Sequence, residues 1–185
     1  LLDRMVEQGH GDSPCFLGAN GQRWTYRDVL EKSNRIARVL TEDLGFVPGN
    51  RVMIRGANNP TFMACWLGIA KAGGIVVATM PLLRGKELAV IAEKADIELA
   101  LCDERLKEEM DSAQAQAQCL KRVVTFNGSG EKGAHGELED RMASKPDGFE
   151  NVDTAADDTV LIAFTSGTTG KPKGTMHFHR DVMAI

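Results

Sequence analysis

Ten consecutive residues near the end of the chain have the composition of a phosphate-binding loop. Residues 165–174 read TSGTTGKPKG, with three glycines, four hydroxyl side chains, two lysines and no acidic residue. Glycine lets backbone N–H groups approach a ligand closely, hydroxyls and successive amides donate hydrogen bonds to anionic oxygens, and lysines add positive charge. The composition therefore predicts a cradle for a polyphosphate. A flexible polar loop between two strands is the alternative, and composition alone leaves it open.

The spacing of this segment differs from the common nucleotide-binding signatures. A Walker A loop requires Gly, four further residues, Gly-Lys and then Ser or Thr. Counted from Gly167, Pro172 stands in place of the second glycine, and counting from Gly170 also fails. The segment also lacks the Gly-x-Gly-x-x-Gly spacing of dinucleotide-binding loops. A P-loop NTPase and a dinucleotide-binding protein are therefore not favoured.

The whole segment resembles the signature loop of the adenylate-forming (AMP-binding) superfamily, which includes acyl- and aryl-CoA synthetases, luciferases and peptide-synthetase adenylation domains. Two earlier stretches resemble other elements of that superfamily in the same order. Residues 24–28 resemble its T-Y-x-x-L element, and residues 71–77 its K-A-G-x-x-x-x-P element, although the proline here is Pro81. Residues 79–84 and 174–181 look closest to benzoate and 2-aminobenzoate CoA ligases.

The resemblance implies a partial N-terminal domain of a ligase with a two-step reaction. A carboxylate attacks the α-phosphate of ATP·Mg to give an acyl-adenylate and pyrophosphate, and the thiol of coenzyme A then displaces AMP. The loop would hold the β- and γ-phosphates, with Lys173 as the nearest cation and Lys171 as a solvated flank. The implied ATP phosphate-binding residues are Thr165, Ser166, Gly167, Thr168, Thr169, Gly170, Lys171, Lys173 and Gly174. No catalytic residue and no metal ligand is expected in these 185 residues, because the family's other site residues lie further along the chain.

The two ends of the sequence bear on the domain organisation. The chain begins at Leu1 without an initiator methionine and stops in the apolar run 182–185. We therefore expect residues 1–185 to be the N-terminal part of the AMP-binding (adenylation) domain, with the small C-terminal domain absent. Such a piece is expected to be inactive alone and to self-associate through exposed apolar surface.

The sequence leaves alternatives open for the substrate and for the class of protein. The preferred substrate is an aromatic carboxylate, and a fatty-acyl or other carboxylate ligase of the same superfamily is the alternative. A non-catalytic module that only binds phosphate is a third possibility. The length of the natural gene would decide between a ligase, which needs a much longer chain, and the phosphate-binding module, which does not.

The composition indicates which binding partners and which cellular compartment to expect. The net charge is −4, from 22 basic and 26 acidic residues, so nucleic acid is a poor candidate partner. No apolar run approaches the roughly 18–20 residues of a membrane span. The four cysteines form no C-x-x-C pair, and Cys65 and Cys102 stand in apolar runs. With no secretion signal, this predicts core thiols in a cytoplasmic protein.

Apolar periodicity and turn residues predict the elements that position the loop. Strands alternate with helices from residue 50 to 126, which predicts an α/β fold with βαβ units around a largely parallel sheet. Residues 127–158 are rich in glycine and charge and are expected to be a surface excursion with one short helix near 138–142. The expected strands are 15–17, 23–25, 52–54, 75–79, 99–102, 122–126 and 159–164, the last one buried. The expected helices are 25–45, 62–72, 86–95 and 104–118.

The resemblance also predicts the path of the chain around the loop. The loop should join two strands, with residues 175–178 extended and a helix starting near His179. Pro172 and the glycines oppose an earlier helix. His177 and His179 could share one face, but no third ligand accompanies them, so a structural role is preferred to zinc.

Overall fold

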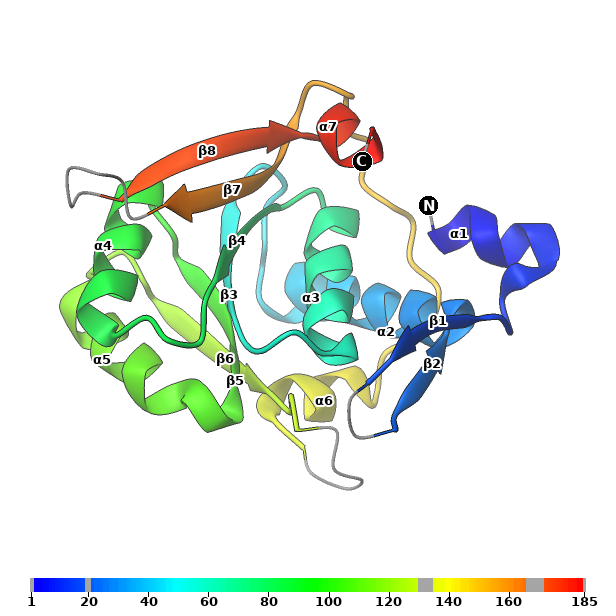
Figure 1. Cartoon of the computed structure of the whole chain (residues 1–185), viewed down its shortest axis with the longest axis horizontal. Helices are drawn as coiled ribbons and strands as arrows, with labels where there is room; N and C mark the ends of the chain where they lie inside the picture. Colours follow the sequence, from blue (N-terminus) through cyan, green and yellow to red (C-terminus); the bar gives the residue numbers. More distant parts are fainter. Residues whose placement is uncertain (1, 19–20, 130–134, 166–171, 185) are drawn as a thin grey trace.

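The computed structural model describes residues 2–18, 21–129, 135–165 and 172–184, and its centre is a six-stranded sheet (Figure 1). The strand order is β6-β5-β3-β4-β7-β8. Neighbouring strands are parallel except β8, which runs antiparallel to β7. The prediction of a largely parallel α/β sheet is confirmed. The strands are β3 (Arg51–Arg55), β4 (Ile75–Thr79), β5 (Leu99–Asp103), β6 (Arg122–Phe126), β7 (Thr159–Thr165) and β8 (Lys173–Phe178).

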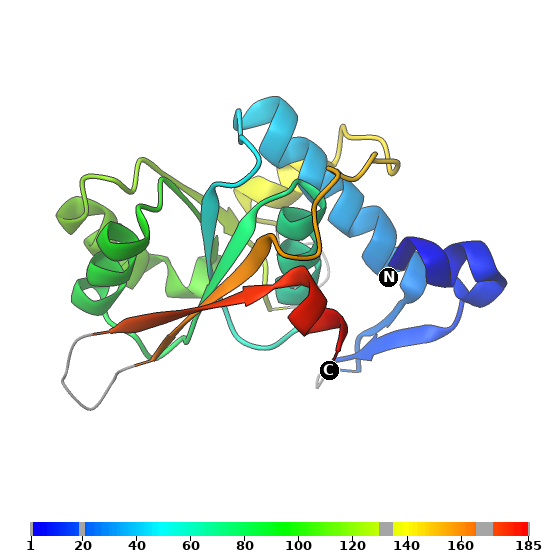
Figure 2. The same ribbon diagram turned by 90° about the horizontal axis from the view of Figure 1, so that it is seen from above.

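Helices cover the sheet on both faces, and the sequence of β3 shows why. Along this strand Val52 and Ile54 belong to one apolar core while Met53 belongs to another, because successive side chains of a strand point to opposite faces. The first core lies under α2, α3 and α6, and the second lies under α4 and α5 (Figures 1 and 2). The α-helices are α1 (Leu2–Met5), α2 (Tyr26–Arg38), α3 (Pro60–Lys71), α4 (Gly85–Ala95), α5 (Lys107–Gln116), α6 (Glu137–Met142) and α7 (His179–Met183). The expected helix 25–45 continues from α2 as a π-helix over Val39–Asp43, and the expected helix 104–118 opens with a 3₁₀ turn over Glu104–Leu106.

The small N-terminal hairpin and the start of α2 form as their sequence predicts. Strands β1 (Pro14–Leu17) and β2 (Arg23–Thr25) pair antiparallel. Thr25 caps α2 by accepting from the Asp28 amide at 3.1 Å, and Asp28 accepts from the Thr25 amide at 2.8 Å. The hydrogen bond from the Thr25 backbone is the main reason that the pKa of the Asp28 carboxyl lies below its usual value. This reciprocal capping satisfies two amides that the helix itself leaves free.

Two predicted features differ in the structure. Only Val160 of β7 is buried, while residues 161–164 are half-buried, because β7 lies next to the edge strand β8 rather than in the middle of the sheet. The short helix of residues 127–158 is present as α6, but Leu138 in it is fully buried in the first core. This part of the segment is packed, which its glycine-rich and charged composition does not indicate.

The packing of α2 on α3 requires a glycine, which gives a stability prediction. A Cβ at Gly68 would lie 2.7 Å from Ile36 Cγ2 and 3.0 Å from the Ser33 carbonyl oxygen. We expect Gly68→Ala to lower the free energy of unfolding by about 1–3 kcal/mol through overpacking, measured by urea denaturation. Gly148→Ala is the control, because a Cβ there meets no atom within 4 Å. Equal stability of the two variants would contradict this close helix packing.

Candidate functional site

The two ends of the predicted phosphate loop are paired strands. Thr165 ends β7, Lys173 begins β8, and the two residues are direct partners in the antiparallel ladder. Both are exposed. Of the nine predicted site residues, the structure brings Thr165, Lys173 and Gly174 together. The other six lie outside the described residues: Ser166, Gly167, Thr168, Thr169, Gly170 and Lys171.

The chain beyond the loop follows the predicted path. Strand β8 is extended to Phe178 and α7 begins at His179, so the prediction of a strand followed by a helix at this position is confirmed. The Phe178 amide donates to the Asp181 carboxylate at 2.9 Å, which caps the helix. His177 and His179 thus lie on different elements. Within the described ranges, no group of three or more His, Cys, Asp or Glu is placed to hold a metal ion.

At the loop end of the hairpin, the alternation of side chains places the polar residues Thr165 and Lys173 on the face opposite Phe164. Thr165 and Lys173 are opposite each other, so their side chains share a face of the ladder. Phe164 and Ile162 point to the other face and pack against the second core. A Cβ at Gly174 would lie 3.0 Å from Ile162 Cγ2 and 3.2 Å from Phe164 Cζ. The hydroxyl and the ammonium are therefore kept apart from the apolar side of the hairpin.

A pocket of about 650 Å³ lies between this hairpin and α4. The ladder between β4 and β7 consists of the single pair Val76 and Leu161, and the end of β7 lies near α4 (Figure 1). The pocket fills the space between the ends of the two strands. Its lining includes Thr165 and Pro172 from the hairpin side and Met80 from the end of β4. Ligands commonly bind outside the carboxyl ends of strands in open α/β sheets, so this pocket and the loop form the candidate site.

One wall of the pocket is held by a buried arginine. Arg55 ends β3 and is 1% exposed. Its guanidinium donates to the carbonyl oxygens of Met80 at 3.2 Å, Pro81 at 2.9 Å and Leu83 at 2.8 Å, while its Nε has no partner. These bonds fix the loop between β4 and α4, although Met80 itself is 63% exposed.

The surroundings of Arg55 affect two ionisation equilibria. Burial lowers the pKa of the Arg55 guanidinium from its usual value. Burial also raises the pKa of the nearby Cys102 thiol to about 12, although the charge of Arg55 opposes this shift. Cys102 is thus a neutral core thiol near pH 7, as the apolar run around it predicts, and Cys65 is fully buried as well.

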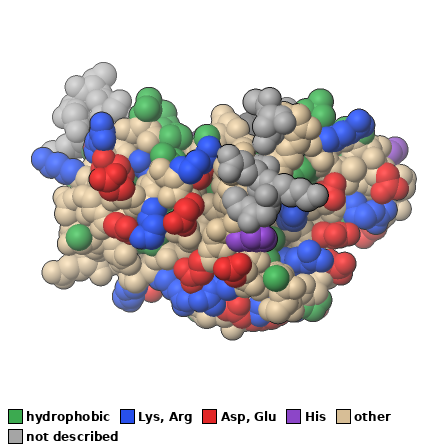
Figure 3. Space-filling view, turned by 90° about the horizontal axis from the view of Figure 1, so that it is seen from below, with side chains coloured by type: hydrophobic (Ala, Val, Ile, Leu, Met, Phe, Trp, Pro, Cys, Tyr) green, Lys and Arg blue, Asp and Glu red, His purple; other side chains and the backbone are tan. Residues whose placement is uncertain are grey.

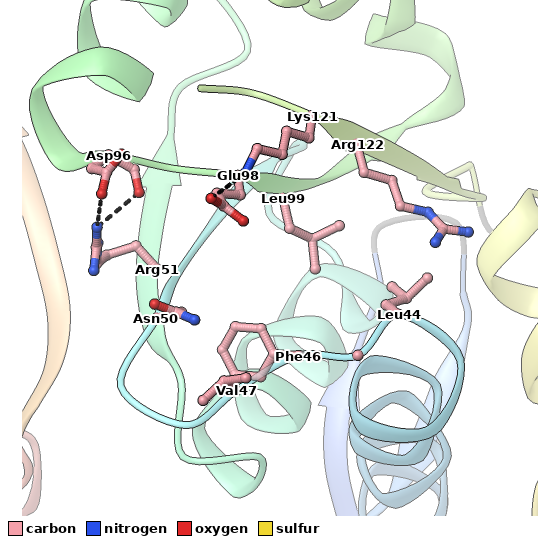
Figure 4. A pocket seen from close by; sticks show the side chains of 11 residues that line it. Leu44, Phe46, Val47, Asn50, Arg51, Asp96, Glu98, Leu99, Lys121 and Arg122 are labelled. Atoms are coloured by element: carbon pink, nitrogen blue, oxygen red, sulfur yellow. Dashed lines mark hydrogen bonds and ion pairs between the residues drawn. The ribbon is translucent and has the colours of Figure 1, made fainter. Parts of the chain in front are cut away.

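A second pocket, of about 300 Å³, lies where the parallel strands begin (Figure 4). Its cations already have partners: Arg51 bonds Asp96 at 3.0 Å, and Lys121 bonds Glu98 at 2.5 Å. Phe46 and other apolar side chains form much of its remaining wall. The paired charges favour a structural role for this pocket.

A Gly-x-Gly-x-x-Gly spacing does occur elsewhere, at residues 128–133 directly after β6. A Cβ at Gly128 would lie 2.0 Å from the carboxylate of Asp103, so this glycine is required by close packing against an acid. The next helix, α6, has its first turn capped by Glu139, which accepts from the amides of Asn127 and Gly136 at 3.0 Å each. The Glu139 carboxylate thus already accepts from amides at the start of α6, the kind of donor that an anion would need at a helix N-terminus.

The surface agrees with the balanced composition of the sequence. On the face shown in Figure 3, acidic and basic side chains are interspersed. Across the part of the chain that the structure describes, no helix has both the length and the apolar character needed to cross a bilayer.

Sequence analysis missed two side chains of this region, Arg55 and Lys94. Lys94, in the last turn of α4, donates a hydrogen bond to the Pro172 carbonyl oxygen at 2.6 Å. A weak signal existed for Arg55, because it is a charged residue that directly follows the apolar run of β3. No signal existed for Lys94, whose contact joins residues 78 positions apart.

Comparison with known proteins gives consistent matches. A family model described as AMP-binding enzyme matches residues 2–185. The benzoate–CoA ligase of Thauera aromatica is 26% identical over 183 residues, which cover 99% of this chain and 34% of that protein. A long-chain-fatty-acid–CoA ligase of Mycobacterium tuberculosis is 31% identical over 160 residues, 86% of this chain and 30% of that protein. The crystal structure of ATP-bound MatB from Rhodopseudomonas palustris superposes with a TM-score of 0.83 and 25% identity, over 99% of this chain and 35% of that one. The chain thus spans about a third of the length of these proteins.

The role of Arg55 can be tested by substitution. Arg55→Met removes the side-chain donor from all three carbonyl groups, of which only that of Met80 also accepts from the Leu83 amide, and we expect the free energy of unfolding to fall by about 2–4 kcal/mol in urea denaturation. Arg55→Lys, which keeps a donor, should lose less. Arg51→Met is the control at the other end of β3, where the guanidinium is partly exposed, and should cost about 1 kcal/mol. If Arg55→Met cost no more than Arg51→Met, the anchoring of the β4–α4 loop by Arg55 would be wrong.

Proposed function

The chain belongs to the AMP-binding enzyme family, and on that premise we propose that it is the N-terminal part of the adenylation domain of an acid–CoA ligase. The observation that carries the proposal is the pairing of Thr165 with Lys173 at the two ends of the glycine- and hydroxyl-rich segment. The ladder brings a hydroxyl and an ammonium together at the mouth of the loop, on the face away from Phe164.

The proposed reaction has two steps. In the first, an oxygen of the carboxylate attacks the α-phosphorus of ATP·Mg, the bond to the bridging oxygen of the β-phosphate breaks, and pyrophosphate leaves. In the second, the sulfur of coenzyme A attacks the carbonyl carbon of the acyl-adenylate, the thiol loses its proton, and AMP leaves. Transfer at phosphorus depends chiefly on positioning and on neutralising charge on the phosphate oxygens.

The described residues would contribute to the first step. Lys173 supplies a positive charge for the leaving pyrophosphate, and Thr165 supplies a hydroxyl donor. Gly174 leaves the backbone of β8 accessible. Residues 166–171 would complete the phosphate cradle, as the resemblance of the segment to the family's signature loop implies.

The preferred substrate is an aromatic carboxylate. The similarity to benzoate–CoA ligase over 99% of the chain supports this choice, together with the form of residues 79–84 and 174–181. A fatty acid is the second candidate, supported by the 31% identity to a long-chain-fatty-acid–CoA ligase. The two identities are too close to separate these substrates, so the experiment must do so.

The decisive experiment measures pyrophosphate exchange into ATP with the protein encoded by the intact gene. We expect exchange that depends on benzoate or 2-aminobenzoate and exceeds exchange with a long-chain fatty acid. A preference for the fatty acid would show that the substrate is not an aromatic acid, and absence of exchange with every acid would contradict the ligase.

The 185-residue chain alone should show no exchange. Holding ATP and the carboxylate together in the right orientation can lower the barrier by up to about 7–11 kcal/mol, and we expect the residues that do so to lie mostly outside this chain. The exposed side chains of Met80, Leu82 and Met176 support self-association of that chain.

The role of Lys173 gives a sharper prediction within the intact protein. Lys173→Ala should lower the rate of adenylation by roughly 10²–10³-fold, the usual effect of removing one electrostatic donor. Thioester formation from a pre-made acyl-adenylate should change much less, because pyrophosphate has then already left. Single-turnover measurements of each step provide the test. Lys107→Ala on α5, where the lysine pairs with Asp111, is the control. If Lys173→Ala slowed thioester formation more than adenylation, the assignment of Lys173 to the adenylation step would be wrong.

A further inference from the structure

The end of the β7–β8 hairpin is attached to α4 by one polar contact. Lys94 Nζ donates to the carbonyl oxygen of Pro172 at 2.6 Å. Pro172 directly precedes Lys173, the first residue of β8. The contact therefore acts on the residue next to the cation that the proposed function places at the phosphates.

The position of this contact matters because the backbone ladder between the hairpin and β4 covers only the first part of β7. Strand β4 pairs with β7 only at Val76 and Leu161, four residues before the strand end. Beyond that pair, Phe164 packs against the second core and lines the pocket together with Val90 and Ile91 of α4. The Lys94 bond adds a directional polar contact where the chain enters β8.

The charge of Lys94 is available for this role. Within the described residues, the structure pairs Lys94 with no carboxylate, although Glu93 is its neighbour in α4. Proline has a fixed φ and no N–H, so the carbonyl oxygen is the group that it offers to a partner. A hydrogen bond from an ammonium is stronger than one between neutral groups.

We propose that Lys94 is a positioning residue for the phosphate-binding loop. By holding the Pro172 carbonyl against α4, it fixes the direction in which the chain enters β8, so that Lys173 is in place before the nucleotide binds. The inference rests on the proposed function of the loop. It requires Lys94 to act on ATP binding rather than on binding of the carboxylate.

Kinetics of the protein from the intact gene test this role. Lys94→Met should raise KM for ATP in pyrophosphate exchange by about three- to tenfold, the effect of losing one hydrogen bond of modest net strength. The KM for the carboxylate and kcat should stay within about twofold. Lys94→Arg should restore KM for ATP, because arginine keeps a charged donor. Lys107→Met on α5 is the matched control.

Two kinetic outcomes would overturn the proposal. One is a Lys94→Met variant that is indistinguishable from Lys107→Met. The other is an equal rise in KM for ATP and for the carboxylate, since a general structural loss affects both.

A measurement without turnover separates this inference from the proposed function. Hydrogen exchange followed by mass spectrometry should show faster exchange across residues 173–178 in Lys94→Met than in the unsubstituted protein, and no change in Lys107→Met. If the unsubstituted protein fails to exchange pyrophosphate, the proposed function is wrong, but hydrogen exchange still decides whether Lys94 holds the hairpin. Unchanged protection of residues 173–178 in Lys94→Met would overturn the positioning role.

Discussion

A single parallel pair, Val76 of β4 with Leu161 of β7, determines where the candidate site lies. Beyond this pair the ends of the two strands contribute to one pocket of about 650 Å³, which is lined by Ala78 and Thr79 of β4 and by Phe164 and Thr165 of β7. The last turn of α4 also reaches this end of the hairpin, through the hydrogen bond from Lys94 to the Pro172 carbonyl oxygen.

The two walls of the pocket are held by different forces. The hairpin wall rests on apolar packing of Phe164 and Ile162 against the second core. The opposite wall, the loop after β4, is held by Arg55 through three carbonyl oxygens. Burying a cation without a carboxylate is unfavourable, and the lowered pKa of Arg55 reflects that cost. In return, the cation fixes a loop that exposes Met80 and Leu82 and therefore has little apolar burial of its own.

Local signals in the sequence predicted most elements correctly. The hairpin of residues 15–25 and the start of the next helix at Thr25, with its reciprocal cap from Asp28, form as expected. Each of these depends on residues a few positions apart, so the sequence contains the whole interaction. The half-burial of β7, the buried Leu138 and the contacts of Arg55 and Lys94 depend on partners far along the chain. Composition could not indicate these partners, and the only local signal was the charge of Arg55 directly after the apolar run of β3.

Gly174 illustrates how the sequence and the structure explain the same residue differently. Its place in the signature segment suggests that it gives a ligand access to the backbone. In the hairpin it faces the apolar side, and a Cβ there would press on Ile162 and Phe164. The two explanations are compatible, because the absence of a side chain lets Phe164 cover the apolar face while leaving the β8 backbone open next to Lys173. A glycine at this position thus links the packing of the hairpin on α4 to the accessibility of the loop, and both are needed for a cation and a hydroxyl to face a phosphate together.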